Sequence, residues 1–188
     1  MDYQLFHAIN SFAGHVDGID DTFEVLAAYV PFVLMGLLLL LWFWPGGRAD
    51  RAERQWSCIA ATVSASLALV INLVIGLIWQ RPRPFVDHNA VLLARHSADG
   101  SFPSDHAAFA FAVGTSIYLI ERRVGIVALL AATAMAFARV YIGVHYVSDV
   151  AIGAAIGVGA AVLVQQLRPL LAPMIDPVLD ALRRGHLA

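Results

Sequence analysis

Three short stretches of the 188-residue sequence hold arginine, serine, histidine and aspartate side chains, which are types that can bind phosphate or take part in its transfer. The stretches are Arg81-Pro-Arg-Pro-Phe85, Phe102-Pro-Ser-Asp-His106, and the run from Arg139 through His145 to Asp149. A guanidinium group offers forked donors that match phosphoryl oxygens, and an imidazole can attack phosphorus or move a proton near neutral pH. We therefore predict a phosphate site at which phosphoryl transfer takes place.

His145 and Asp149 are four residues apart, so on a helix they stack on one face. The carboxylate can then hold one ring nitrogen while the other nitrogen points at the substrate. We predict that His145 is the nucleophile, forming a phosphohistidine, and that Asp149 orients it. We predict that His106 is the general acid that protonates the leaving oxygen and the base that later activates water.

The pair Pro103-Ser104 is typical of a helix start, with Ser104 as the N-cap. The free backbone N–H groups that follow, from Asp105 onwards, would point at an anion beyond the helix start. Arg83 lies in a segment fixed by proline, and Arg139 lies at the end of an apolar run, so both can donate to phosphoryl oxygens. The predicted phosphate-binding residues are Arg81, Arg83, Ser104, Asp105 and Arg139.

The inventory of polar residues excludes several kinds of chemistry. All 12 basic residues are arginine, which rules out a P-loop lysine or a Schiff-base lysine. The site has no cluster of His, Cys or carboxylate residues at zinc spacing, so we expect no metal and no cofactor. A weak divalent-ion site at Asp105 and His106 is a minor alternative, because hard cations normally take several oxygen ligands.

The composition places these polar residues in a membrane protein. Hydrophobic residues make up 60% of the chain, charged residues make up 14%, and the mean hydropathy is +0.72. An ionisable group at membrane depth is costly, so it persists mainly where it is paired, faces water or does chemistry. The formal net charge of −2 offers no basic face, so nucleic-acid binding is not expected.

Five apolar runs are predicted to cross the membrane as helices. Residues 25–47 and 55–80 carry no charge over 23 and 26 residues, which is enough for a span. The runs at 107–120, 124–138 and 150–167 are shorter and border the polar stretches, so their helices would cross with the polar ends included.

We expect an all-α integral membrane protein built as a bundle of about five to six transmembrane helices. It would form a single domain, because 188 residues leave no room for a second one. The predicted parts are an interfacial N-terminal segment at 1–22, a helical bundle at 23–168 and a cytoplasmic tail at 169–188.

The placement of arginine predicts the orientation. Eight of the 12 arginines fall in the connections and tail at 48–54, 121–123 and 168–188, and by the positive-inside rule these face the cytoplasm. The N-terminus and the site would then face the extracytoplasmic side, which agrees with five crossings. The arginines on that side are Arg81, Arg83, Arg95 and Arg139.

The two terminal segments and one glycine pair leave alternatives open. Apolar residues between Leu5 and Phe12 recur at helical spacing, which fits either a helix in the membrane interface or packing on the bundle. Prolines between Pro169 and Pro177 interrupt the tail, for which we expect a surface position. Gly153 and Gly157 let two helices approach closely; packing inside the bundle is favoured over a dimer face, and the oligomeric state stays open.

The three stretches resemble the motifs of the type 2 phosphatidic acid phosphatase superfamily, membrane lipid phosphatases related to the vanadium haloperoxidases. The family pattern is a lysine, six residues and Arg-Pro; then Pro-Ser-Gly-His; then Ser-Arg, five residues, His, three residues and Asp. Arg83-Pro84, Pro103-Ser104-Asp105-His106 and the set of Arg139, His145 and Asp149 match this pattern. Three positions depart from it, because Gly76 replaces the lysine, Asp105 the glycine and Ala138 the serine. Arg81 is a candidate for supplying the lysine's charge.

Within the superfamily, the run Arg-Pro-Arg-Pro-Phe with Pro-Ser-Asp-His resembles the branch of bacterial undecaprenyl-diphosphate phosphatases associated with bacitracin resistance. The resemblance implies removal of the terminal phosphate from undecaprenyl diphosphate on the outer face of the bacterial cytoplasmic membrane. This reaction regenerates the carrier lipid for peptidoglycan synthesis. The expected partners are the polyprenyl diphosphate and membrane lipids.

Two alternatives remain open at this point. The same residues would serve a phosphatase for phosphatidylglycerophosphate, phosphatidate or a lipid A phosphate. A non-enzymatic protein that binds or transports an anionic lipid is the other alternative, although it would have no need for a nucleophile and an acid in this arrangement.

Overall fold

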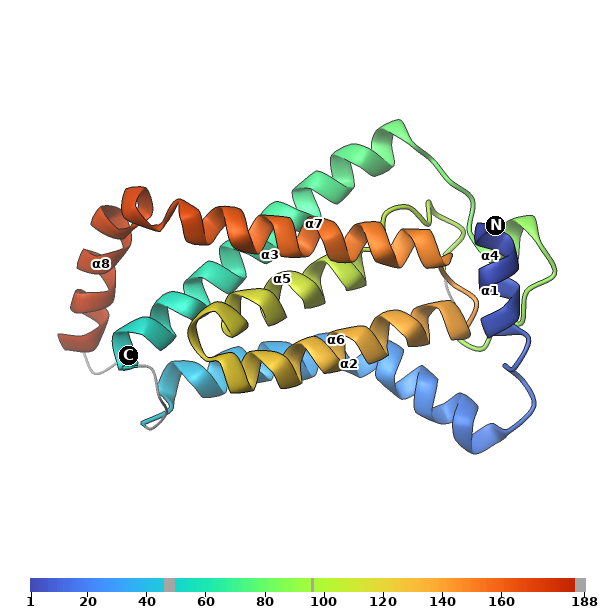
Figure 1. The fold of residues 1–188 in the computed structure, drawn as a ribbon, viewed down its shortest axis with the longest axis horizontal. Helices are drawn as coiled ribbons and strands as arrows, with labels where there is room; N and C mark the ends of the chain where they lie inside the picture. The colour runs from blue at the N-terminus through green and yellow to red at the C-terminus, as the bar shows by residue number, and fades with distance from the viewer. Residues whose placement is uncertain (46–49, 96, 185–188) are drawn as a thin grey trace.

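The computed structural model describes residues 1–45, 50–95 and 97–184, and every regular element in these ranges is a helix (Figure 1). The predicted fold class is thereby confirmed. Arg48 and the end of the predicted tail at 185–188 lie outside the described residues. The elements are α1 (Asp2–Asn10), α2 (Asp17–Phe43), α3 (Arg51–Ile78), α4 (Pro84–Asp87), α5 (Asp105–Ile120), α6 (Arg122–Tyr141), α7 (Val147–Gln166) and α8 (Arg168–Arg184).

Five helices, α2, α3, α5, α6 and α7, form an elongated bundle in which successive helices run in opposite directions (Figure 1). All of these except α5 are long and apolar enough to cross a membrane. The central helix, α5, packs against α3, α6 and α7. With 16 residues it is about 24 Å long, shorter than a hydrocarbon core of about 30 Å. Helix α5 begins deeper in the bundle than the end of α6 and the start of α7 (Figure 1).

The first spanning helix begins earlier than the charge-free run predicts. Helix α2 starts at Asp17 and so includes the acidic residues that precede the charge-free run at 25–47. Asp20 is buried there and accepts hydrogen bonds from the Gly14 N–H at 3.1 Å and the Tyr141 hydroxyl at 2.7 Å. Acidic groups in a first turn also favour the positive end of the helix dipole. Charge thus ends the apolar run, but it does not end the helix.

Small residues allow α7 to lie directly on α5. A Cβ atom at Gly153 would overlap the carbonyl oxygen of Ser104, and one at Gly157 would overlap the carbonyl oxygen of Ala108. The glycine pair therefore serves packing inside the bundle, as the sequence favours. This close approach also fixes the start of α5 against the start of α7, where the predicted site residues lie.

The N-terminal helix α1 packs on the bundle end. Phe6 is buried against Tyr146, with 5.6 Å between the ring centroids. Asn10 is also buried, and its side-chain amide donates to the carbonyl oxygens of Tyr141 at 2.7 Å and Val91 at 2.8 Å. Of the two predicted alternatives, the structure shows packing on the bundle, although Phe12 stays 70% exposed.

At the opposite end of the bundle, α8 lies across the helix ends (Figure 1). Arg168 forms a two-pronged ion pair with Glu53, with N–O distances of 2.6 and 2.7 Å, and its guanidinium carbon lies 5.0 Å from the Trp56 ring centroid. Pro173 and Pro177 lie inside α8 without ending it. The predicted interruption of the tail by prolines is therefore wrong for residues 168–184. Leu170 and Met174 of α8 are exposed, and the surface position of the tail stays a prediction.

Candidate active site

The predicted residues converge at the bundle end that carries α1. The segment between α3 and α5, the start of α5, the end of α6 and the turn before α7 all meet there (Figure 1). They enclose a polar cavity of about 250 Å³, lined by Arg83, Asp99, Gly100, Pro103, Asp105, His106, Arg139 and His145. Five of the eight predicted site residues line this cavity, and they come from three different parts of the chain.

His145 is buried, and its two ring nitrogens have different surroundings. Nδ1 lies 2.9 Å from the backbone carbonyl oxygen of Ser101. Because a carbonyl oxygen only accepts hydrogen bonds, this contact assigns a proton to Nδ1 and leaves Nε2 of the neutral ring as an acceptor. Nε2 lies 3.4 Å from Nη1 of Arg83 and 3.4 Å from Nη2 of Arg139. The nitrogen that carries the lone pair is therefore placed between two guanidinium groups at the cavity wall.

Asp149 is fully buried beside His145, but it is not the direct partner of the ring. Its Oδ2 lies 3.7 Å from Nδ1 of His145, beyond hydrogen-bonding distance, and accepts from the Tyr146 backbone N–H at 2.8 Å. The Ser101 carbonyl oxygen makes the hydrogen bond that the sequence assigns to Asp149. Asp149 thus caps the start of α7 and places a carboxylate near the ring.

The two arginines that face Nε2 are both buried and held by their surroundings. Arg83 donates from Nη1 to the Val144 carbonyl oxygen at 3.0 Å and from Nε to Asp99 Oδ1 at 2.9 Å. The prolines on both sides of Arg83 keep its backbone extended at the start of α4. Arg139 lies in the last turn of α6, 5% exposed. The predicted pairing of Arg83 and Arg139 around one site is present in the structure.

The start of α5 supplies the other side of the cavity. Ser104 is the N-cap of this helix, as the sequence predicts, and its hydroxyl accepts from the Ala107 N–H at 3.5 Å. Asp105 and the half-buried His106 follow it and line the cavity. Asp105 also accepts a hydrogen bond from the buried Asn72 amide of α3, at 2.9 Å. The free N–H groups and the helix dipole at this start favour an anion in the cavity.

Of the predicted phosphate-binding residues, Arg83, Asp105 and Arg139 line the cavity, whereas Ser104 and Arg81 do not. The guanidinium group of Arg81 donates to Asp149 Oδ1 at 2.8 Å, to the Ser148 hydroxyl at 2.7 Å and to Asp2 Oδ2 at 2.7 Å. It also covers the Tyr146 ring, with 3.8 Å from the guanidinium carbon to the ring centroid. Arg81 therefore contacts Asp149 on the side of His145 that faces away from the cavity.

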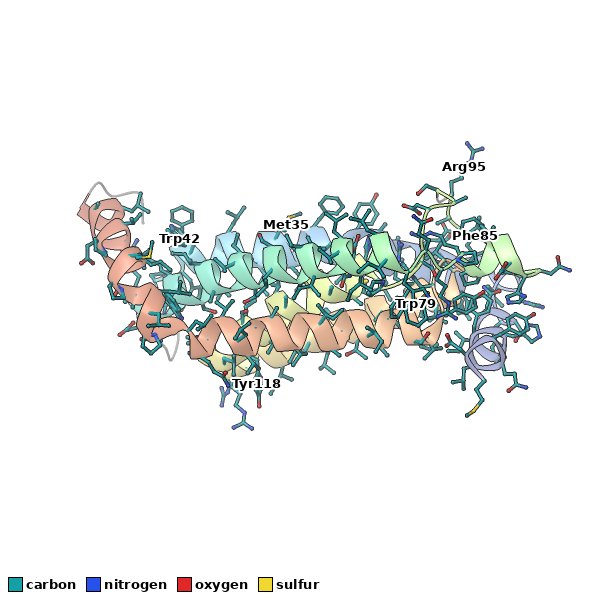
Figure 2. All side chains as sticks on the ribbon, turned by 90° about the horizontal axis from the view of Figure 1, so that it is seen from above. Met35, Trp42, Trp79, Phe85, Arg95 and Tyr118 are labelled. Carbon is teal, nitrogen blue, oxygen red and sulfur yellow. The ribbon has the colours of Figure 1, made fainter. Side chains whose placement is uncertain are left out.

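An apolar groove adjoins the polar cavity and shares two of its residues. The groove has a volume of about 250 Å³ and contains Asp105 and His106 together with apolar residues of α2, α3 and α5. These are Ala28, Pro31, Phe32, Met35, Leu69 and Phe109. Figure 2 shows Met35 on the outer surface of the bundle. The polar cavity therefore opens toward a surface that faces lipid when the bundle crosses a membrane.

Sequence reasoning missed several groups that hold the site together. Ser101 acts through its backbone carbonyl oxygen, which carries no residue-type signal. Asp99, Asn72 and Asp2 contact site residues from loops or helices far away in the sequence. In contrast, Arg95, on the same segment between α3 and α5 as Asp99, projects outward and is exposed (Figure 2). Only the fold distinguishes these polar residues from one another.

These features define a class: a multi-pass helical membrane protein in which arginines and histidines from separate helices meet at one polar cavity beside an apolar groove. The sequence pattern of the PAP2 superfamily matches residues 55–171. The chain belongs to the PAP2 superfamily and is a phosphatase of that family.

Known proteins resemble the chain in sequence and in fold. It is similar to undecaprenyl-diphosphatase BcrC of Bacillus subtilis (strain 168), with 30% identity over 150 residues that cover 80% of this chain and 75% of the relative. The crystal structure of Aquifex aeolicus LpxE superposes with a TM-score of 0.74 at 24% identity, over 88% of this chain and 94% of that one. A PAP2 type phosphatidylglycerolphosphate phosphatase from Bacillus subtilis gives a TM-score of 0.53 at 19% identity, over 90% and 94% of the two chains. The two solved structures confirm the fold.

Proposed function

We propose that the protein removes the terminal phosphate from undecaprenyl diphosphate, giving undecaprenyl phosphate and inorganic phosphate through a phosphohistidine at His145. The observation that carries this proposal is the position of His145 Nε2, 3.4 Å from a guanidinium nitrogen of Arg83 and of Arg139. A phosphoryl group that binds both arginines comes within reach of the unprotonated nitrogen. The similarity to undecaprenyl-diphosphatase BcrC supports this choice of substrate.

In the first chemical step, the lone pair of Nε2 forms a bond to the terminal phosphorus, and the bond from phosphorus to the bridging oxygen breaks. His106 donates its proton to that oxygen, so that lipid monophosphate leaves. In the second step His106 accepts a proton from water, the water oxygen bonds to phosphorus, and the phosphorus–nitrogen bond breaks. Arg83, Arg139 and the N–H groups at the start of α5 stabilise the charge on the equatorial oxygens in both steps.

The surroundings of Nδ1 favour this role for His145. When Nε2 bonds to phosphorus, the ring keeps its proton on Nδ1 and becomes positively charged. The Ser101 carbonyl oxygen at 2.9 Å accepts that proton's hydrogen bond, and the Asp149 carboxylate at 3.7 Å lies close enough to stabilise the charge. Because Asp149 is fully buried, water screens this interaction little.

The apolar groove supplies a place for the lipid part of the substrate. Its two polar residues, Asp105 and His106, are shared with the cavity, so a lipid whose phosphate is in the cavity can lay its first apolar carbons along Leu69 and Phe109. His106 lies at this junction, where the oxygen that leaves with the lipid must be protonated.

The proposed location is the bacterial cytoplasmic membrane, with the site on the extracytoplasmic side. The arginines Arg51, Arg122 and Arg168 begin helices at the bundle end opposite the site (Figure 1). Positive residues concentrate on the cytoplasmic side of membrane proteins. A carrier lipid diphosphate released on the outer face would therefore meet the cavity directly.

A comparison of substrates tests the proposal. Purified protein in detergent is given undecaprenyl diphosphate or phosphatidylglycerophosphate at equal concentration, and released phosphate is measured. We expect a value of kcat/KM at least about 10-fold higher for the diphosphate, which corresponds to about 1.4 kcal/mol of transition-state binding. A preference for phosphatidylglycerophosphate, phosphatidate or a lipid A phosphate would assign the site to another lipid. Absence of phosphate release from every substrate would favour a protein that binds or transports anionic lipid.

A further inference from the structure

We propose that Arg81 is a positioning residue for His145, acting through Asp149, and that it connects the N-terminal helix α1 to the active site. This inference rests on the proposed role of His145 as the nucleophile. It changes the role expected from the sequence, in which Arg81 contacts phosphate in place of the lysine that Gly76 replaces.

The geometry of Arg81 favours this role. One nitrogen, Nη1, donates to both Asp149 Oδ1 and the Ser148 hydroxyl, at 2.8 and 2.7 Å, and the other, Nη2, donates to Asp2 Oδ2 at 2.7 Å. The face of the guanidinium group lies on the Tyr146 ring. A guanidinium group held by two carboxylates and one aromatic face has its donors directed away from the cavity. Its side chain is 25% exposed, compared with 5% for Arg83, which lines the cavity.

The charges in this cluster also argue against a phosphate contact. Arg81 contributes one positive charge, while Asp2 and Asp149 contribute two negative charges, so the cluster has a formal charge of −1. A phosphate dianion is repelled by such a group of charges and attracted by Arg83 and Arg139 on the other side of His145. The charge of Arg81 therefore stabilises the ionised form of Asp149.

Asp149 needs this support because its position depends on few other groups. Its Oδ2 is fixed by the Tyr146 N–H at 2.8 Å, and Arg81 holds the other oxygen, Oδ1. Together these contacts set the orientation of the carboxylate, which keeps Oδ2 3.7 Å from Nδ1 of His145. Without Arg81, the buried carboxylate of Asp149 loses its ion pair with the guanidinium group at 2.8 Å. We expect it then to turn or to take up a proton, and His145 loses the negative charge behind it.

Asp2 extends the same cluster to α1. Its carboxylate accepts from the Ser148 backbone N–H at 3.1 Å, from the Ser148 hydroxyl and from Arg81. Burial alone would raise the pKa of Asp2, but the hydrogen bonds from Ser148 and Arg81 outweigh it and hold the pKa below its ordinary value. Asp2 is therefore ionised at neutral pH and ties the first turn of α1 to the first turn of α7, next to Asp149.

The experiment separates positioning from phosphate binding by steady-state kinetics. Arg81→Met keeps much of the side-chain volume and removes the charge, and Arg95→Met is the matched control, because Arg95 belongs to the same segment between α3 and α5 and is exposed. Wild type is measured first, with a lipid diphosphate that it hydrolyses, so that failure of the proposed function is seen before any variant is compared. The inhibition constant for inorganic phosphate is measured in parallel.

We expect Arg81→Met to lower kcat by about 10- to 100-fold, as misplacement of a catalytic group does, while KM and the inhibition constant for phosphate change by less than about 3-fold. Arg95→Met should keep wild-type values. A rise of about 10-fold or more in the inhibition constant with kcat unchanged would overturn the inference and assign Arg81 to phosphate binding. Wild-type kinetics in Arg81→Met would overturn it as well.

A second variant tests the same inference if Arg81→Met does not fold. Asp2→Asn removes one charge from the far side of the cluster and leaves Arg81 and Asp149 in place. We expect a fall in kcat of about 2- to 5-fold with KM unchanged, because Arg81 loses one of its two carboxylate partners. If Arg81→Met does not fold, an unchanged kcat in Asp2→Asn counts against the inference, and a reduced kcat supports it.

Discussion

The two ends of the bundle both contain arginines paired with carboxylates, yet the pairs differ in burial and in the number of segments that contribute to them. At the end with α8, Arg168 and Glu53 form a two-pronged pair, but their side chains stay 32% and 38% exposed. At the end with α1, two of the pairs contain one deeply buried member: Asp149 is fully buried beside Arg81, which is 25% exposed, and Arg83 is 5% exposed beside Asp99, which is 62% exposed. The groups around His145 come from α1, the segment before α5, α6 and α7.

This difference shows why similar ion pairs have different consequences. An exposed pair is screened by water and contributes about 0 to 1 kcal/mol to stability. A buried group of charges is screened much less, so removing one member leaves another without compensation. We therefore infer that the α8 end uses its pair to attach a surface helix, whereas the α1 end uses its charges for chemistry.

The largest expected effect comes from the two histidines that line the cavity. His145→Ala removes the proposed attacking nitrogen and His106→Ala removes the proposed leaving-group acid, so each should reduce phosphate release at least about 1,000-fold. The matched control is His15→Ala, since His15 is exposed between α1 and α2. Phosphate release and thermal unfolding are measured for all three variants. Near-normal turnover in either cavity variant would remove that histidine from the mechanism.

Two arginines on one helix sharpen the comparison between the ends. Arg139 and Arg123 both belong to α6, but Arg139 faces His145 and Arg123 is exposed at the opposite end. Arg139→Lys keeps the charge and loses the forked donors, so we expect kcat/KM to fall about 100-fold. Arg123→Lys should leave it unchanged. Equal kinetics of the two variants would contradict the account of the cavity.

Helix α3 offers a matched pair for the apolar groove. Leu69 lines the groove beside His106, and Val63, six residues earlier in α3, lines a different apolar pocket. Their exposures are similar, 36% and 40%. We expect Leu69→Trp to lower kcat/KM about 10-fold for undecaprenyl diphosphate and less than about 2-fold for a short-chain, water-soluble diphosphate. Val63→Trp should affect neither substrate, and a loss common to both substrates would place the lipid chain elsewhere.

The smallest effect is expected at the α8 end. Glu53→Gln leaves Arg168 able to reach water, so unfolding should become easier by less than about 1 kcal/mol, with kcat unchanged. The comparison is with Asp2→Asn, which changes a carboxylate–arginine contact at the active-site end. Chemical denaturation and steady-state rates are measured for both. A larger loss of activity in Glu53→Gln than in Asp2→Asn would reverse the assignment of the two ends.

Much of the architecture could be predicted because membrane-spanning helices are recognisable in the sequence as long apolar runs. The helices α3 and α7 start about four and three residues before the predicted runs, since Arg51 and Asp149 lie in first turns that the charge-free criterion excludes. The proline interruptions predicted for the tail do not occur because the ring of Pro173 or Pro177 removes one backbone donor without ending the surrounding helix.

The convergence of Arg83, His106, Arg139 and His145 could also be predicted, because phosphoryl transfer needs those groups around one anion. The partners of Arg81 could not. Asp2 and Asp149 are 147 positions apart in the sequence, so their common contact with Arg81 could not be inferred from spacing. The residue types also do not indicate that the Ser101 backbone carbonyl oxygen contacts His145, or on which side of His145 Arg81 lies. Contacts made by backbone atoms and by distant acidic residues become visible only in the fold.

The stereochemical course at phosphorus tests the central role of His145 most directly. A lipid diphosphate made chiral at the terminal phosphorus with sulfur and oxygen isotopes is hydrolysed in isotopically labelled water, and the configuration of the released thiophosphate is determined. Attack by His145 followed by attack of water inverts phosphorus twice, so the account predicts net retention. Net inversion would show that water attacks phosphorus directly, and would contradict a phosphohistidine at this site.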